Sequence, residues 1–272
     1  MLDNVGYIKI RQFDGSTPSE LDYAIRALSA NGAASLVFDL RDNGGGVLDD
    51  AISCINLIVP EGTVAYAEDK NGNRTVVGSS DSETETALPL VCLVNGSTAS
   101  AAELFAASLR TMSGARLVGT TTMGKGTIQN SPQRLSDGSA VSITVAKLIC
   151  GDGTSFDGTG LSVDVERALS ADEANSYLDY TPTTDPQIQR AVSAAQQLSG
   201  TTTVAGANDS ASSAAASEAA DSTAADAETA PETDAPEEPA DTAQSEAAAD
   251  SAAQEIIRTP PKAAAYPATA FF

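Results

Sequence analysis

Residues 91–129 read VCLVNGSTASAAELFAASLRTMSGARLVGTTTMGKGTIQ, and this stretch decides the fold. Residues 91–94 form a short apolar run, which predicts a buried strand, and the polar residues after it predict a turn. The residues after Ser100 predict a helix with one apolar face, and residues 116–119 predict a second strand. A lysine between two glycines, Lys125, follows that strand. The succession of strand, turn and helix places Ser100 beside the unpaired backbone N–H groups that begin a helix.

Two interpretations of this serine remain open from the local pattern. Ser97, Thr98 and Ser100 belong to residue types that commonly cap helices, a role that requires no catalysis. Alternatively, the free N–H groups and the helix dipole would stabilise the oxyanion that develops when a serine attacks a carbonyl. Features elsewhere in the chain have to decide between the two.

Strands and helices alternate on the N-terminal side of this stretch. Residues 35–40 form an apolar run suited to a buried strand, and three glycines, residues 44–46, follow it. Their spacing fits neither of the common phosphate-binding motifs. They predict either a tight corner between strand and helix or a turn that offers a backbone N–H, such as that of Gly45, to a bound group. The other elements predicted here are a strand at 6–11, helices at 17–30 and 47–59, and a hairpin of 64–67 with 75–77.

The C-terminal side predicts one further strand, at 141–149, and a last helix, at 185–198. Alternating strands and helices indicate an α/β domain over residues 1–200. Residues 201–272 are mainly Ala, Ser, Thr, Asp, Glu and Pro, with thirteen acidic residues against two basic ones. Because so few large apolar side chains are available there, we expect an acidic disordered tail.

Charge and hydropathy exclude several classes of partner. The formal net charge of −22 argues against binding to nucleic acid or to anionic membrane surfaces. We find no apolar run of the length that crosses a bilayer, and residues 1–4 do not resemble a signal peptide. The sequence itself therefore indicates no compartment.

Histidine is absent from the sequence. This excludes Ser-His-Asp and Cys-His arrangements and the common zinc sites within the chain, and we expect neither a metal nor another cofactor. The three cysteines have no metal-like spacing and are expected to be buried thiols; they are Cys54, Cys92 and Cys150. A serine nucleophile would need another base, and Lys125 is the obvious candidate among the five lysines. Its position between glycines, without a nearby acidic residue in the sequence, is compatible with a buried lysine whose pKa is lowered. The alternative is an ordinary surface lysine in a loop.

Several motifs occur together in the order and spacing of one family. The chain resembles the C-terminal processing peptidases, also called tail-specific proteases, over roughly residues 5–198. The motifs that carry the resemblance are Gly6-Tyr7-Ile8, Phe13 with Thr17 and Glu20, residues 39–46 (DLRDNGGG), residues 97–103 (STASAAE), residues 124–129 (GKGTIQ) and, in a weaker form, residues 158–165 (GTGLSVDV). Residues 102, 123 and 163 depart from the family pattern.

The resemblance assigns roles to matching residues. It implies that Ser100 is the nucleophile, that Lys125 is the general base, and that Gln129 orients the lysine. The oxyanion hole would consist of the Ala101 N–H and one N–H of the glycine turn, which the resemblance assigns to Gly45. The implied activity is a serine endopeptidase that cleaves polypeptides near their C-termini.

The resemblance also implies a crotonase/Clp-peptidase-like core of mixed sheets with flanking helices. Family members are exported or membrane-associated, and a PDZ domain that binds the substrate's C-terminus precedes their catalytic domain. We therefore expect an extracytoplasmic catalytic domain without the PDZ domain. The alternative is a catalytically silent peptide-binding or scaffolding domain, or an inactive fragment. The oligomeric state is not predicted.

Overall fold

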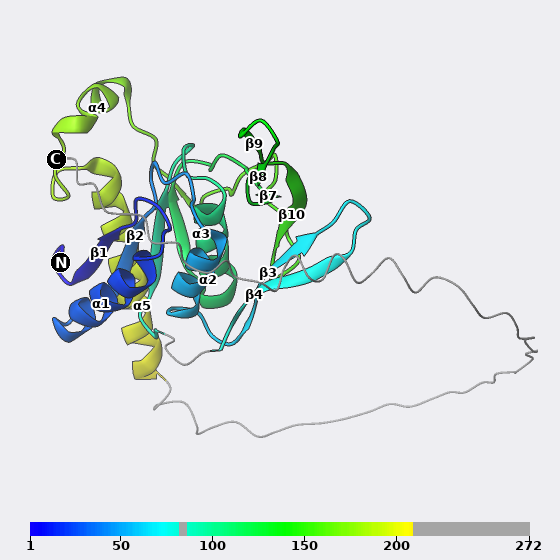
Figure 1. Cartoon of the computed structure of the whole chain (residues 1–272). Coiled ribbons are helices and arrows are strands. Elements are labelled where there is room, and N and C mark those ends of the chain that lie inside the picture. The colour runs from blue at the N-terminus through cyan, green and yellow to red at the C-terminus, as the bar shows by residue number, and fades with distance from the viewer. Residues whose placement is uncertain (82–85, 209–272) are drawn as a thin grey trace, which may run out of the picture. The chain divides into compact units, whose positions relative to one another are not determined.

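The computed structural model describes residues 1–81 and 86–208, and of residues 201–208 it describes the backbone alone. Helices flank two main sheets in this part of the chain (Figure 1). The larger sheet is parallel throughout, in the order β1 (Val5–Lys9), β2 (Ser35–Asp39), β5 (Leu90–Val94), β6 (Arg116–Gly119) and β11 (Val165–Glu166). The smaller is antiparallel, in the order β4 (Arg74–Ser80), β3 (Gly62–Glu68), β10 (Thr144–Cys150) and β7 (Thr127–Gln129). A short pair, β8 (Gln133–Arg134) with β9 (Ala140–Val141), completes the described strands.

Both faces of the parallel sheet are covered, which explains why β2 and β5 are apolar along their whole length. On one face, Leu36 and Phe38 pack in a core shared with helices α1 (Thr17–Ala30), α2 (Leu48–Asn56) and α3 (Ala101–Ser113). On the other face, Val37 packs against the long helix α5 (Pro186–Asn208). The alternation of side chains along a strand divides the apolar residues between the two cores.

The predicted α/β class with mixed sheets and flanking helices is confirmed. The strand predicted at 141–149 is divided: β9 ends at Val141 and β10 begins at Thr144. Hydrogen bonds from the Ser142 hydroxyl and the Ile143 N–H to Asn130 interrupt the ladder between them. The helix predicted at 47–59 is shorter in the structure, where α2 ends at Asn56.

The C-terminal part differs more from the prediction. Helix α4 (Ala171–Asn175) and the 3₁₀ turn η1 (Tyr177–Asp179) were not expected from the sequence. Helix α5 continues beyond the predicted end to Asn208, eight residues into the segment predicted as tail. The rest of that segment, 209–272, lies outside the described residues, so the tail stays a prediction. None of the helices in the described ranges is long and apolar enough to cross a membrane.

Candidate active site

Ser100 lies at the junction between β5 and α3, in the turn that the sequence predicts. Its backbone has a φ of 59°, a left-handed conformation that is uncommon for a residue with a side chain and is often found at functional sites. The hydroxyl of Thr98 accepts a hydrogen bond from the Asn95 N–H and donates one to the Leu40 carbonyl. That hydroxyl therefore joins the turn to the end of β2 and does not cap the helix.

The glycine turn that follows β2 lies directly against this serine. A Cβ atom on Gly45, whose φ is 106°, would lie 3.0 Å from the Ser100 Cβ and 3.0 Å from the Ala99 carbonyl oxygen. Only glycine fits both the close approach and the backbone conformation. The carbonyl of Asn43 accepts a hydrogen bond from the Ala99 N–H at 2.9 Å, which fixes the turn to the residue before the serine.

The backbone N–H groups beside Ser100 differ in their partners. The Ala101 N–H, at the first position of α3, and the Gly46 N–H have no hydrogen-bond acceptor in the described part of the chain. The Gly45 N–H, expected in the oxyanion hole, instead donates to the Asn43 Oδ1 at 2.8 Å. Ala101 and Gly46, whose N–H groups have no acceptor among the described residues, line one cavity together with Ser100.

One buried carboxylate connects the serine turn with the lysine loop. Glu103 is fully buried, and its Oε2 accepts hydrogen bonds from the backbone N–H groups of both Ser100 and Lys125, each at 2.9 Å. Its Oε1 accepts from the Thr122 hydroxyl at 2.5 Å and from the Gly124 N–H at 2.7 Å. No role was predicted for Glu103, although a glutamate three residues after a helix-capping serine is a recognised capping signal.

The lysine loop is anchored through its backbone. The Gly126 N–H donates to the Asp157 carboxylate, and the Gly158 N–H donates to the Gly124 carbonyl. The Lys125 side chain is exposed, and its amine has no hydrogen bond or ion pair with any described residue, Ser100 included. The burial expected for this lysine is therefore not present in this conformation, because the contacts that hold the loop leave its side chain free to face water.

Gln129 also has partners other than the expected one. It is an exposed residue at the end of β7, an edge strand of the antiparallel sheet. Its amide nitrogen donates to the hydroxyls of Thr127, at 2.9 Å, and Thr144, at 3.4 Å. The side chain contacts its own sheet here and makes no hydrogen bond with Lys125.

A cavity of about 160 Å³ brings several of these residues together. Ser100, Ala101 and Gln129 line it, with Gly46 and Thr127. Three apolar side chains complete the wall: Leu48, Ile128 and Leu148. Lys125 does not line this cavity, and Gly45 lies behind it against Ser100. The cavity therefore offers a small, partly apolar space beside the serine.

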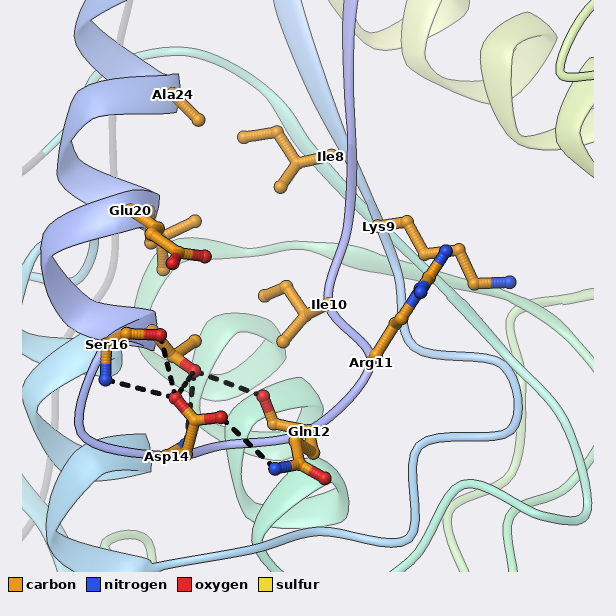
Figure 2. Close-up of a pocket in the computed structure, with 11 residues that line it drawn as sticks. Ile8, Lys9, Ile10, Arg11, Gln12, Asp14, Ser16, Glu20 and Ala24 are labelled. Atoms are coloured by element: carbon orange, nitrogen blue, oxygen red, sulfur yellow. Dashed lines mark hydrogen bonds between the residues drawn. The ribbon is translucent and has the colours of Figure 1, made fainter. Parts of the chain in front are cut away.

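A separate hollow of about 400 Å³ lies between β1 and α1 (Figure 2). Ile8 and Ile10 point toward α1, whereas Lys9 and Arg11 point away from it. The carboxylate of Asp14, which lines the hollow, accepts hydrogen bonds from the Ser16 N–H and hydroxyl, and hydrogen bonds of this kind lower its pKa to about 2. This hollow contains none of the residues predicted for the site.

The described residues contain no group of three or more Cys, Asp or Glu side chains that could hold a metal ion. Cys54, Cys92 and Cys150 are free and buried, as predicted. Burial raises the pKa of the Cys92 thiol to about 12, which keeps it protonated and unreactive at neutral pH.

Comparison with known proteins identifies the family. The sequence profile of peptidase family S41 matches residues 4–167. The carboxy-terminal processing protease CtpA of Bacillus subtilis (strain 168) is 39% identical over 178 residues, which are 65% of this chain and 38% of that protein. The chloroplastic C-terminal processing peptidase of Tetradesmus obliquus is 35% identical over 162 residues, which are 60% of this chain and 35% of that protein.

A solved structure agrees with these matches. The photosystem II D1 C-terminal processing protease has 35% sequence identity and a TM-score of 0.57, over 60% of this chain and 42% of that one. A putative S41 protease from Bacteroides fragilis NCTC 9343, with 20% identity and a TM-score of 0.56, shares the fold. The chain spans less than half the length of the two sequence relatives. Since the family profile matches more than half of the chain, this protein belongs to peptidase family S41.

Proposed function

We propose that this chain is a serine endopeptidase that cleaves polypeptides near their C-termini, with Ser100 as nucleophile and Lys125 as general base. The observation that carries the proposal is the strained backbone of Ser100, which lines a partly apolar cavity together with Ala101 and Gly46, two residues whose N–H groups have no acceptor among the described residues. The names of the relatives, which are C-terminal processing proteases, support polypeptides as the substrates. We also propose an extracytoplasmic location, which rests on the family resemblance alone; the relatives include both bacterial and chloroplastic proteins.

The proposed reaction is acyl transfer. Ser100 Oγ attacks the peptide carbonyl while Lys125 takes its proton, and the amine then gives that proton to the leaving nitrogen. Water hydrolyses the acyl-enzyme in the second half of the reaction. Each N–H group that binds the oxyanion is typically worth about 3–4 kcal/mol of transition-state stabilisation.

The two oxyanion donors are proposed as the Ala101 N–H and one N–H of the glycine turn. The Gly45 N–H can serve only after it leaves the Asn43 Oδ1, which it contacts in this structure. The Gly46 N–H needs no such change, because it has no acceptor among the described residues, and Gly46 lines the cavity with Ser100.

The proposed base needs a change of environment before it can act. A lysine accepts a proton only in its neutral form, which contact with water disfavours. A polypeptide bound across β7 and the cavity would cover Lys125 and exclude that water. Gln129, at the end of the same strand, is proposed to orient the amine once the chain is in place.

A second function, a catalytically silent peptide-binding domain, is favoured by one observation: Lys125 is exposed and makes no hydrogen bond with Ser100. Acylation by a serine-directed probe separates the two functions. A silent domain would bind peptide and leave Ser100 unlabelled in every variant.

The test uses the full chain and measures both labelling of Ser100 and cleavage of an unfolded polypeptide. Ser100→Ala and Lys125→Ala are expected to lower cleavage by about 1,000-fold or more, since loss of either member disables the pair. Gln129→Ala is expected to lower it by about ten-fold, through loss of orientation. Lys147→Ala is the matched control, because this lysine is also exposed, on the neighbouring strand β10. Retained cleavage in Ser100→Ala or Lys125→Ala would overturn the assignment.

A further inference from the structure

Arg41 begins the turn 41–46 that contains the three glycines, and its side chain is held both by a neighbour in the sequence and by residues more than 140 positions away. Its guanidinium is 2% exposed and makes two hydrogen bonds with the Asp39 carboxylate, from Nε at 2.9 Å and from Nη2 at 2.7 Å. Its Nη1 donates to the Asp185 Oδ2 at 2.9 Å and to the Gln187 Oε1 at 2.9 Å. Asp185 and Gln187 lie at the start of α5, beyond the segment that the family profile matches.

The partners of Arg41 are themselves fixed. The Asp185 Oδ1 accepts hydrogen bonds from the backbone N–H groups of Gln187 and Ile188, so one oxygen caps α5 while the other holds the guanidinium. The Gln187 amide donates to the Arg167 carbonyl. Helix α5 packs its apolar face on the parallel sheet, which sets the position of Asp185 relative to β2.

The electrostatics of this cluster hold Arg41 charged in a buried place. Burial alone disfavours a charged guanidinium, but hydrogen bonds and attraction from Asp39, and attraction from Asp185, raise the pKa of Arg41 above its usual value. The Tyr7 hydroxyl donates to the Asp39 Oδ2 at 2.7 Å, and the ring of Tyr177 lies 5.8 Å from the guanidinium carbon. Loss of one carboxylate would leave a buried charge only partly balanced.

The turn that starts at Arg41 connects this cluster with the serine. Asp42 adopts a φ of 64°, and its carboxylate accepts hydrogen bonds from the Asn95 amide and the Tyr177 hydroxyl. The carbonyl of the next residue, Asn43, accepts a hydrogen bond from the Ala99 N–H, and Gly45 lies against Ser100 itself. Movement of Arg41 would therefore shift the turn that provides one of the two proposed oxyanion donors and that contacts Ser100.

We propose that Asp185 is a positioning residue: by holding Arg41 it fixes the glycine turn against Ser100, which makes the start of α5 part of the active-site framework. The inference rests on the proposed peptidase function. Asp185 touches no reacting atom, and its effect would pass through Arg41 to the turn. A misplacement of about 1 Å in such a turn can lower a catalysed rate by about 100-fold.

The test compares three variants of the full chain. Asp185→Asn keeps the size and helix-capping ability of the side chain, but its amide cannot accept hydrogen bonds from both the helix and Arg41. Asp185→Glu restores the charge and is the conservative rescue. Val192→Ala is the control for destabilisation, because it shortens a buried side chain of α5 that lies outside the Arg41 cluster. Each variant is measured for thermal midpoint, kcat and KM of peptide cleavage, and amide hydrogen exchange of residues 41–46.

Asp185→Asn is expected to lower kcat by about 10- to 100-fold with KM unchanged, and to speed exchange in the turn. Asp185→Glu should recover part of the rate, and Val192→Ala should keep it despite a lower thermal midpoint. Unchanged kcat in Asp185→Asn, or an equal loss of kcat in Val192→Ala, would overturn the proposal. If the unmodified chain neither cleaves peptide nor is labelled at Ser100, the peptidase function is what fails. Exchange in the turn then decides the structural part alone: faster exchange in Asp185→Asn supports it, and unchanged exchange overturns it.

Discussion

The serine side and the lysine side of the proposed site are built in different ways. The turns around Ser100 are held by buried polar groups, with Arg41, Asn43, Thr98 and Glu103 all at most 2% exposed. On the other side, Lys125 is held only through its backbone, and its amine faces water. The proposed nucleophile is therefore fixed in advance, whereas the proposed base would have to be brought into position when a bound polypeptide covers it.

This difference places the regulation of the proposed activity on the lysine side. A fixed turn requires no reorganisation during the reaction, which is the property that effective oxyanion binding needs. An exposed lysine, by contrast, costs nothing to hold in water, but it cannot act as a base until water is excluded. Cleavage would then depend on the bound polypeptide itself, because only a substrate that covers Lys125 would exclude the water. Peptide bonds in substrates that leave Lys125 uncovered would not be cleaved.

The largest expected effect compares removal of one positive charge from each side. Arg41→Met leaves the Asp39 and Asp185 carboxylates buried without their cation, which should lower the free energy of unfolding by about 3–5 kcal/mol. Lys125→Met removes an exposed charge without a partner and should change it by less than about 0.5 kcal/mol. Urea denaturation of both variants measures the difference. Equal losses of unfolding free energy in the two variants would mean that the serine side is held no more tightly than the lysine side.

The next effect concerns Glu103, the residue that joins the two sides. In Glu103→Gln, an NH₂ group replaces one carboxylate oxygen. If it faces Ser100 and Lys125, two backbone N–H donors lose their acceptor; if it faces Thr122 and Gly124, the Gly124 N–H loses its acceptor, whereas the Thr122 hydroxyl can turn and accept from the amide. Leaving at least one buried donor unpaired should cost about 2 kcal/mol of unfolding free energy.

The same variant should also lower kcat, because both the serine turn and the lysine loop lose their common anchor. The exposed Glu61, at the start of the segment that leads into β3, offers a matched control. Glu61→Gln is expected to change the unfolding free energy by less than about 0.5 kcal/mol. A Glu103→Gln protein with unaltered stability and rate would show that the two sides are positioned independently.

Sequence reasoning succeeded where the signal is local. The apolar runs at 35–40 and 91–94 predicted the buried strands, and the three glycines at 44–46 predicted a sharp corner, because strand burial and backbone conformation depend mainly on neighbouring residues. Ser100 was placed correctly at the start of a helix for the same reason. These predictions required no knowledge of the tertiary structure.

The parts that could not be predicted depend on contacts between distant residues. Nothing in the sequence around Arg41 indicates that its guanidinium meets Asp185, and nothing near Gln129 indicates that its amide contacts Thr144. The sequence left open whether Lys125 is buried or exposed, and the structure exposes it in this conformation; the absence of acidic neighbours in the sequence says nothing about access of water. The environment of a side chain is a property of the packed structure.

The smallest expected effect tests how tightly the serine side is held, through the pH dependence of stability. Burial, and then the neighbouring Asp39 carboxylate, raise the pKa of the Tyr7 hydroxyl above its usual value. A group whose pKa is raised on folding contributes stability that is fully present below the pKa of the unfolded chain, about 10 for tyrosine, and is lost as the pH rises above it. At pH 7, where the hydroxyl is protonated in both states, Tyr7→Phe should lower the unfolding free energy by about 1.5 kcal/mol, because the hydrogen bond to Asp39 is lost.

Above about pH 10 the gap between Tyr7→Phe and the unmodified chain should shrink, because ionisation of the unfolded tyrosine withdraws up to about 1.4 kcal/mol per pH unit from the unmodified chain alone. The buried thiols titrate in the same range, but they are common to both proteins and cancel in the difference. Urea denaturation at pH 7, 9, 10 and 11 measures the gap. A gap that stays constant across this range would mean that the Tyr7 hydroxyl is accessible to water, and that the Arg41 cluster is open on that side instead of being closed around the turn.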